Sequence, residues 1–221
     1  MRFVGRNSEA YCADQQQPAH YGLRPNAPYV IAAAARAASV WFVFGLSSVI
    51  AAQAQTIEEK ALVCSACHGD NGTPQDKATP VIAGQHQGYL YLQLRDYKLG
   101  TRANEVMAPI AQALERDEMM ALAEYFSKQR WPNLRQPAAS AAETATALRA
   151  NASIGCTGCH LGEYQGDGTQ PRIAGQSKEY MAQTMLDFRT RARANNPGMS
   201  DLMRATSEAE IAAMAAYLAG R

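Results

Sequence analysis

Two short segments of this chain place cysteine and histidine at a spacing that suits covalent attachment of an iron cofactor. Residues 64–68 read CSACH and residues 156–160 read CTGCH, so both follow the pattern C-x-x-C-H. Two thiols three positions apart can bond to the vinyl-derived carbons on one edge of a haem, and the adjacent histidine can bind its iron. The pattern therefore predicts two covalently bound haem c groups. Their attachment residues are Cys64, Cys67, Cys156 and Cys159, and their iron ligands include His68 and His160.

Other uses of paired cysteines fit the sequence less well. A thioredoxin-like C-x-x-C belongs to a βαβ setting, and the sequence shows no β-pattern of any length. A zinc site of four thiolates requires the two pairs to meet across some 90 residues and leaves both histidines without a role. A disulfide within C-x-x-C is strained. The fifth cysteine, Cys12, stands alone near the N-terminus.

An internal repeat accounts for the pairing of the motifs. Cys64 and Cys156 are 92 positions apart, and PVIAGQ at 80–85 matches PRIAGQ at 171–176 with a shift of 91. Further matches at the shift of 91 are Tyr89 with Tyr180, Asp96 with Asp187, and Arg102 with Arg193. The chain beyond residue 54 is therefore predicted to be two copies of one module of roughly 80 residues.

Helical periodicity dominates each copy. Capping-box patterns at 56–59 and 140–143 begin a helix that leads into each C-x-x-C-H. Amphipathic patterns predict further helices over 87–98 and 116–127, and over 178–189 and 207–218. The predicted fold is all-α, with domains at 55–130 and 140–221. The linker at 131–139 contains two prolines, which end the preceding helix.

The iron needs a sixth ligand unless it keeps an open position. Met107 follows His68 at the same interval along the chain as Met199 follows His160. A methionine thioether raises the reduction potential and closes the iron to small ligands. Because their spacing from the motif is equal in both copies, Met107 and Met199 are predicted as the sixth ligands, in loops that precede the last helix of each copy.

The remaining methionines and histidines receive other roles. Met203 is the rival to Met199, but it aligns with an alanine in the first copy and ranks below it. His86 aligns with a serine and is predicted to be solvated, and His20 lies in the N-terminal segment. Methionines within helical patterns that lack an equivalent in the other copy are predicted to fill cores. They are Met119, Met120, Met181, Met185 and Met214.

The N-terminal segment, 1–54, has the features of a secretory signal peptide. Four arginines precede an apolar run at 37–50, and Ala52-Gln53-Ala54 supplies a small-residue cleavage site. The run is shorter than the roughly 20 residues that span a membrane. Cleavage after Ala54 and a periplasmic location are therefore predicted, with an uncleaved anchor as the alternative. The long segment ahead of the run also leaves open a translation start further in, near Leu23 or Val30.

Charge narrows the function classes. The formal charge of the whole chain is +1, and from Gln55 onward 17 basic residues stand against 18 acidic ones. No basic footprint of a nucleic-acid-binding protein is present. An iron with methionine as sixth ligand offers no place for a substrate, so the pattern predicts outer-sphere electron transfer without a small-molecule substrate.

With these motifs, residues 56–220 resemble the di-haem cytochrome c4 family, in which two class I cytochrome c domains stand in tandem. The resemblance is carried by the two C-x-x-C-H motifs, the repeated P-x-I-A-G-Q, the stretch YLYLQLRDYKLGTR at 89–102 and the methionine loops. It implies that His68 and Met107 hold one iron, and that His160 and Met199 hold the other. It also implies that the carbonyls of Pro80 and Pro171 accept the Nδ1–H of the axial histidines, and Arg102 and Arg193 are candidates for contact with haem propionates.

The resemblance further implies a respiratory-chain carrier in the periplasm. Such a carrier passes electrons from a quinol-oxidising complex or a dehydrogenase to a terminal oxidase through transient contacts with redox proteins, in some members with peripheral membrane association. The alternative is the cytochrome subunit of a periplasmic dehydrogenase, such as a flavocytochrome c sulfide dehydrogenase. A di-haem peroxidase or a thiosulfate-oxidising enzyme is disfavoured, because the chain is short and has a methionine in both copies. The copies differ at 92–95 against 183–186, so unequal reduction potentials are predicted.

Overall fold

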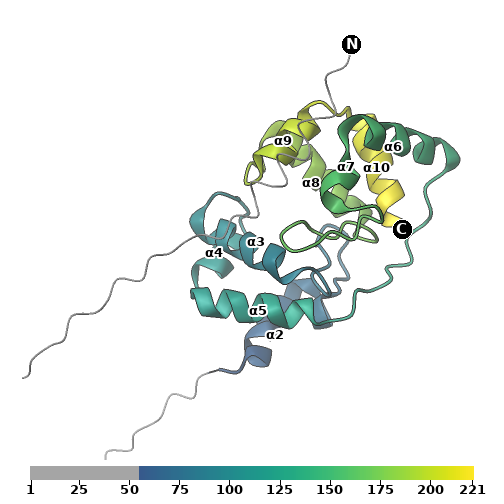
Figure 1. Ribbon diagram of the computed structural model, residues 1–221. Helices are drawn as coiled ribbons and strands as arrows, with labels where there is room; N and C mark the ends of the chain where they lie inside the picture. The colour runs from purple at the N-terminus through teal and green to yellow at the C-terminus, as the bar shows by residue number, and fades with distance from the viewer. Residues whose placement is uncertain (1–54) are drawn as a thin grey trace, which may run out of the picture. The chain divides into compact units, whose positions relative to one another are not determined.

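The computed structural model describes residues 55–221 (Figure 1). The predicted signal peptide and Cys12 lie outside the described residues. Within residues 55–221 all regular elements are helical, and the one extended pairing is an isolated bridge between Asp167 and Gln170. This confirms the predicted all-α fold. No helix in this part of the chain is both long and apolar enough to cross a bilayer.

The helices repeat in the same order in both copies (Figure 1). The first copy contains α2 (Ile57–His68), the short 3-10 helix η1 (Asp70–Gly72), α3 (Gln87–Leu99), α4 (Met107–Gln112) and α5 (Arg116–Ser127). The second contains α6 (Ala141–Ile154), α7 (Cys156–His160), α8 (Lys178–Thr190), α9 (Pro197–Arg204) and α10 (Glu208–Ala219). Residues 131–139, the predicted linker, form no helix.

The predicted capping boxes form as the sequence indicates. The Thr56 hydroxyl accepts the backbone N–H of Glu59, whose carboxylate accepts the N–H of Thr56 in return. Ser140 and Glu143 form the same reciprocal pair at the start of α6. Each box satisfies backbone donors that the first turn of a helix leaves without partners. These local signals place the start of the helix that leads to each C-x-x-C-H motif.

The two motif-bearing helices end differently. In the first copy α2 continues through Cys64 to His68 without interruption. In the second copy Gly155 adopts a left-handed conformation, with φ of 72°, and separates α6 from the single turn α7. The first copy has Val63 at the equivalent position. A β-branched residue does not adopt positive φ readily, whereas glycine does, so the break follows from this one difference.

The sequence patterns missed two helices. The segments that carry Met107 and Met199 were expected to be loops, but Met107 is the first residue of α4 and Met199 lies in the first turn of α9. Asparagine side chains begin both helices: Asn104 Oδ1 accepts the N–H of Met107 at 2.8 Å, and Asn196 Oδ1 accepts that of Met199 at 3.0 Å. Pro197 at the first position of α9 further favours a helix start there.

Each copy has its own hydrophobic core. In the first copy α2 and α3 pack on α5, and in the second α6 and α8 pack on α10. Of the methionines predicted as core, Met119, Met181 and Met214 are buried and Met185 packs against the core. The prediction for Met120 was wrong, because its exposed fraction is 40%. Adjacent helical residues project about 100° apart, so Met119 and Met120 do not share the buried face.

Two glutamines join the copies through the repeated P-x-I-A-G-Q segment. The side-chain amide of Gln176 accepts the N–H of Val81 and donates to its carbonyl, both at 2.9 Å. The side-chain amide of Gln85 does the same with Arg172, also at 2.9 Å for both bonds. Gln85 and Gln176 are equivalent in the repeat, as are Val81 and Arg172. The contact is therefore reciprocal, as a pseudo-two-fold interface requires.

Candidate haem sites

Both motif histidines are buried at the end of their motif helix. His68 is 7% exposed and His160 is 6% exposed. The Nδ1 atom of His68 donates to the carbonyl of Pro80 at 2.9 Å, and that of His160 donates to the carbonyl of Pro171 at 2.9 Å. The two bonds that the family resemblance implied are thus both present.

These bonds prepare each imidazole to bind a metal. Burial lowers the pKa of both histidines, although the proline carbonyls act in the opposite direction. The neutral ring is therefore favoured, and a carbonyl at Nδ1 requires the proton to sit there. The lone pair is then on Nε2, which is the form that ligates iron, and the carbonyl bond fixes the ring orientation.

The cysteines of each motif lie one helical turn apart, so their side chains point to the same side of the helix. Cys67 is exposed, while Cys64, Cys156 and Cys159 are half-buried. Burial raises the pKa of the Cys64 thiol and raises that of Cys156 to about 11. Cys64, Cys67 and Cys156 are free of disulfides. The Cys64 and Cys67 thiols suit two thioether bonds to one haem edge.

The predicted methionine ligands are half-buried at the start of their short helices. Met199 also packs in a hydrophobic cluster with Ile154, which lies two positions ahead of Cys156. The cluster thus connects the methionine segment of the second copy with its motif segment. Met203, the rival ligand, is a fully integrated core residue of the same cluster, with 3% of its surface exposed.

Two buried arginines supply positive charge at the contact between the copies. Arg102 is 8% exposed and lies over the ring of Tyr97, and Arg193 is 7% exposed and lies over that of Phe188. Among the described residues, Asp96 is the one buried carboxylate. A surplus of buried cation is costly unless an anion compensates it. Carboxylates such as haem propionates would compensate this charge, and contact of Arg102 and Arg193 with propionates stays a prediction.

The positive charge of the buried arginines also changes the pKa of neighbouring tyrosine hydroxyls. Burial alone raises the pKa of Tyr180, but Arg102 and Arg193 outweigh it and lower this pKa to about 7. Burial raises the pKa of Tyr97 to about 12, and Arg102 counteracts it only in part. Tyr180 receives a hydrogen bond from Arg102 at 3.2 Å, which stabilises its anionic form. The electrostatic environment between the copies thus favours negative charge.

Fold and site together define a class of protein. Two all-α modules each present a C-x-x-C-H motif, a buried histidine fixed by a carbonyl, and a methionine on a short helix. These are the features of a c-type cytochrome with two haem domains.

Comparison with known proteins agrees with this class. The family model of cytochrome c matches residues 51–131 and again 147–221. A cytochrome c4 of Thiocapsa roseopersicina is 37% identical over 168 residues, which cover 72% of this chain and 86% of that protein. A thiosulfate dehydrogenase electron acceptor of Stutzerimonas stutzeri is 34% identical over 170 residues, covering 72% and 79%. A solved cytochrome c4 structure from Acidithiobacillus ferrooxidans has a TM-score of 0.65 at 32% identity, covering 72% of this chain and 98% of that one.

This chain therefore belongs to the cytochrome c family and, within it, to the di-haem cytochromes c4. It is an electron-transfer protein with two covalent haem c groups.

Residues at the contact between the copies were missed by sequence reasoning. His86, predicted to be solvated, is half-buried and its Nε2 donates to the carbonyl of Gln165 in the second copy at 2.8 Å. Gln93 and Asn195 take part in hydrogen bonds that cross between the copies. The signal that could have identified Asn195 is the change of the repeat shift from 91 at Arg193 to 92 at Met199.

Proposed function

We propose that this chain is a periplasmic electron carrier with His/Met ligation at both irons. The observation that carries the proposal is the matched pair of buried histidines, each fixed by a proline carbonyl directly behind a C-x-x-C motif. The proposed modules are residues 55–130 and 140–221, with a linker at 131–139. The first haem is attached to Cys64 and Cys67, with His68 and Met107 on its iron; the second is attached to Cys156 and Cys159, with His160 and Met199 on its iron.

The bound haem supplies a one-electron couple at its iron. The protein's own residues set the conditions for that couple. The carbonyls of Pro80 and Pro171 make their histidines stronger donors and prevent rotation of the rings. The Met107 and Met199 thioethers are soft ligands that favour the reduced iron and exclude small molecules. These assignments describe a carrier rather than an enzyme.

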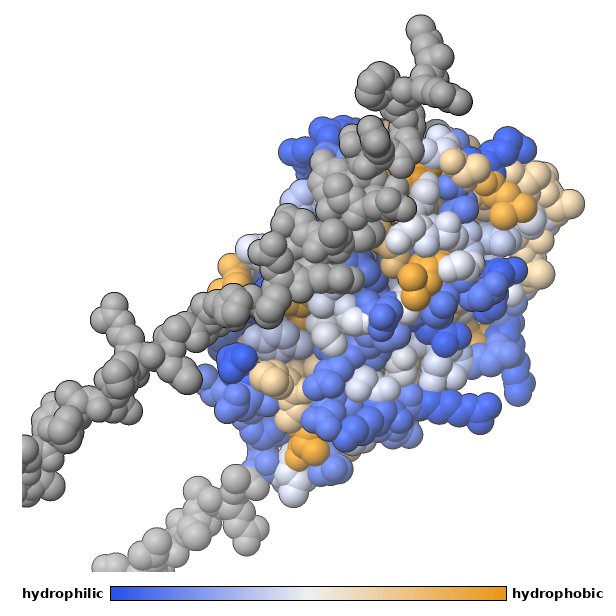
Figure 2. Space-filling model, viewed as in Figure 1, coloured by the Kyte–Doolittle hydropathy of each residue, from blue (hydrophilic) through white to orange (hydrophobic). Residues whose placement is uncertain are grey.

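The surface suits brief contacts with other redox proteins. The face in Figure 2 is mainly hydrophilic, with small and separate hydrophobic patches. Leu62 is 68% exposed and Val63 is 59% exposed, directly ahead of Cys64 on α2. A small apolar patch with a polar rim is typical of weak, transient electron-transfer complexes. We infer that a quinol-oxidising complex or a dehydrogenase donates electrons and that a terminal oxidase accepts them.

The test is a spectroscopic redox titration of the secreted protein, with N-terminal sequencing of the same sample. The sequence should begin at Gln55, and two one-electron steps at positive potential should appear with little binding of cyanide. Met107→Ala and Met199→Ala should each open one iron to cyanide and lower one potential. Met120→Ala, which removes an exposed methionine, is the matched control and should change neither. Rapid cyanide binding by the unaltered protein would contradict the proposed ligation.

A second candidate concerns the electron donor. The relative from Stutzerimonas stutzeri is named a thiosulfate dehydrogenase electron acceptor, which favours a periplasmic dehydrogenase of reduced sulfur compounds as donor. Stopped-flow reduction by a purified thiosulfate dehydrogenase and by a quinol-oxidising complex would decide between them. Saturable, faster reduction by the dehydrogenase supports the second candidate. Faster reduction by the quinol-oxidising complex supports that complex as the donor.

A further inference from the structure

The two haem modules contact each other through a second set of reciprocal hydrogen bonds. Nη2 of Arg102 donates to the Tyr180 hydroxyl at 3.2 Å, and Nη2 of Arg193 donates to the Tyr89 hydroxyl at 3.3 Å. The two arginines are equivalent in the repeat, and so are the two tyrosines. This part of the contact therefore treats both modules alike.

Gln93 breaks that symmetry. Its equivalent in the second module is Thr184, which has no amide group. The Oε1 atom of Gln93 accepts from Arg102 and from Arg193, both at 2.8 Å, and from Asn195 at 3.2 Å. Two of these three donors belong to the second module. A single side chain of α3 thus holds the segment that follows α8.

The segments that lead to the two methionines also differ in length. Five positions separate Arg102 from Met107, whereas six separate Arg193 from Met199. In the shorter segment Asn104 uses its side chain to accept the N–H of Met107. Within the described residues, Asn104 forms no hydrogen bond with the second module. The backbone of Met107 is therefore held by its own module, and the first methionine segment reaches the second module through the Arg102 bond to Tyr180.

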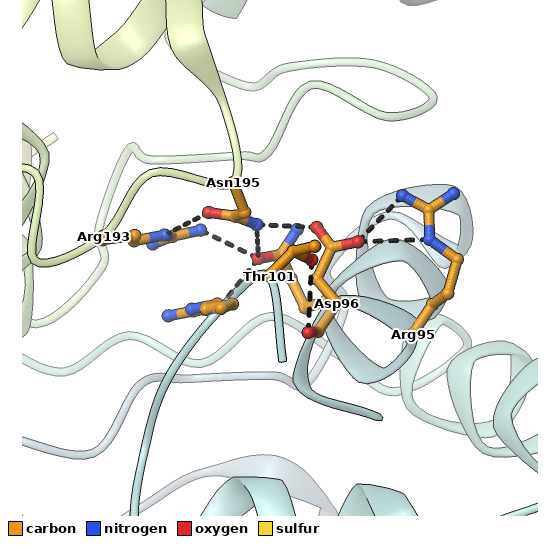
Figure 3. Close-up of polar contacts among 7 residues, drawn as sticks. Arg95, Asp96, Thr101, Arg193 and Asn195 are labelled. Carbon is orange, nitrogen blue, oxygen red and sulfur yellow. Dashed lines mark hydrogen bonds and ion pairs between the residues drawn. The ribbon is translucent and has the colours of Figure 1, made fainter. Parts of the chain in front are cut away.

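The extra residue of the longer segment produces two adjacent asparagines with separate tasks. Asn196 accepts the N–H of Met199. Because Asn196 accepts this N–H, the Asn195 side chain is available for another partner. Its Nδ2 donates across the contact to Oδ2 of Asp96 at 2.7 Å (Figure 3). Its Oδ1 accepts from Nε of Arg193 at 3.0 Å, which orients the amide.

The bond to Asp96 joins a neutral amide to a buried charge. The Asp96 side chain is 8% exposed, so water does not readily replace a lost partner. Hydrogen bonds to an ionised acceptor are roughly twice as strong as neutral ones. Arg95 donates to the other oxygen, Oδ1, at 2.8 Å from a more exposed position, with 44% of its side chain accessible. The two donors therefore share one carboxylate but lie in different surroundings (Figure 3).

We propose that Asn195 is a positioning residue through which the first module holds the methionine segment of the second. Through its hydrogen bonds to Gln93 and Asp96, it holds residues 193–199 in the conformation in which Met199 can bind the iron. The second iron therefore retains Met199 only while the modules are docked. The first iron does not depend on the second module in this way. The inference rests on the proposed ligation of the second iron by Met199.

The test compares Asn195→Ala with Arg95→Ala in the di-haem protein. Loss of a hydrogen bond to a buried charge should raise the fraction of molecules in which Met199 has left the iron about tenfold or more. We expect cyanide binding to one of the two ferric haems to become faster by that factor, and the potential of this haem to fall. Proton NMR of the reduced protein, with signals assigned through Met199→His, should show weakening of the Met199 methyl signal alone. Arg95→Ala should leave both haems unchanged.

Exchange of Asn195 and Asp96 distinguishes a specific positioning role from a general loss of stability. Asn195→Asp should open the second haem, because it places two carboxylates against each other. Combination with Asp96→Asn recreates a donor and an acceptor at the same place, so the double variant should recover the slow cyanide binding of the unaltered protein. Failure of this recovery would overturn the positioning role.

Other results are equally decisive. Equal opening of both haems in Asn195→Ala, or no change at either, would refute the asymmetric dependence. Absence of both methionine methyl signals from the unaltered protein would instead refute the proposed ligation, so the two failures are distinguishable.

Discussion

Replacement of Gln176 by alanine should weaken the contact between the two haem modules more than any other single truncation at the P-x-I-A-G-Q segment. The Gln176 amide forms three hydrogen bonds: it accepts from the N–H of Val81 at 2.9 Å and of Ser177 at 2.8 Å, and it donates to the carbonyl of Val81 at 2.9 Å. Alanine can form none of them.

The magnitude follows from burial around these bonds. Val81 is 1% exposed and Ser177 is 3% exposed, so no water reaches the groups that lose their partner. At about 1 kcal/mol for each neutral hydrogen bond, the loss of three lowers the free energy of unfolding by about 3 kcal/mol. Gln85→Ala removes the three mirrored bonds, but Arg172 is only half-buried and water can replace part of them. The cost of Gln85→Ala should therefore be lower, about 2 kcal/mol.

The assay is equilibrium urea unfolding of the di-haem protein, followed by far-ultraviolet circular dichroism and by haem absorbance. Unaltered protein should unfold in one transition that both probes report, because the modules support each other. Gln176→Ala should lower the midpoint and split the transition into two steps, because the modules then unfold separately and each probe reports both of them. A cost below about 0.5 kcal/mol, the usual range for surface substitutions, would refute the view that this contact couples the modules.

Two other predictions concern the second module. Gly155→Ala forces a residue with a Cβ to a φ of 72° ahead of Cys156, so it should cost about 1 kcal/mol in the free energy of unfolding, whereas Gly162→Ala, with open space around it, should be neutral. The hydroxyl and backbone N–H of Ser207 hold the pKa of Glu210 below its ordinary value of 4.5. The stabilisation by this cap is therefore present above pH 4.5 and is lost as the pH falls below it. Glu210→Gln should flatten the dependence of unfolding free energy on pH in that range, as measured by urea unfolding across the interval.

Much of the fold could be predicted because its signals are local. A capping box, a 3.6-residue period and a proline pair each act over a few residues, and they predicted the long helices within one or two residues. The covalent pattern C-x-x-C-H is equally local. The bonds of His68 and His160 to proline carbonyls came from the family resemblance, because no local rule connects a histidine with a carbonyl 11 or 12 positions away.

The rest depended on short elements and long-range contacts. Helix α4 has six residues and α9 has eight, too few for a periodic pattern to stand out. The prediction for Met120 was wrong because a helical pattern shows that a residue lies in a helix, not which side of the helix faces the core. Cross-module bonds such as that of Gln176 to Val81 span 95 positions, and the repeat shows only that both copies own the same glutamine. The backbone group that each glutamine amide binds is decided by how the two modules pack together, which the repeat does not show.

The near-symmetry of the module contact limits where a difference between the haems can arise. The bonds of Gln85 to Arg172 mirror those of Gln176 to Val81, and the bond of Arg102 to Tyr180 mirrors that of Arg193 to Tyr89. Because they are mirrored, they act on both haem environments alike and cannot by themselves separate two reduction potentials. The predicted inequality of the potentials must then come from the broken pairs. Three of these adjoin the haem motifs or the methionine segments: Gln93 against Thr184, the Asn195-Asn196 pair against Asn104, and Gly155 against Val63. The first two bind the second module to the first, and the third interrupts the motif helix of the second module. In the first module the side chain that caps the methionine helix bonds within its own module, whereas in the second module the adjacent asparagine also bonds Asp96 and Gln93 of its neighbour.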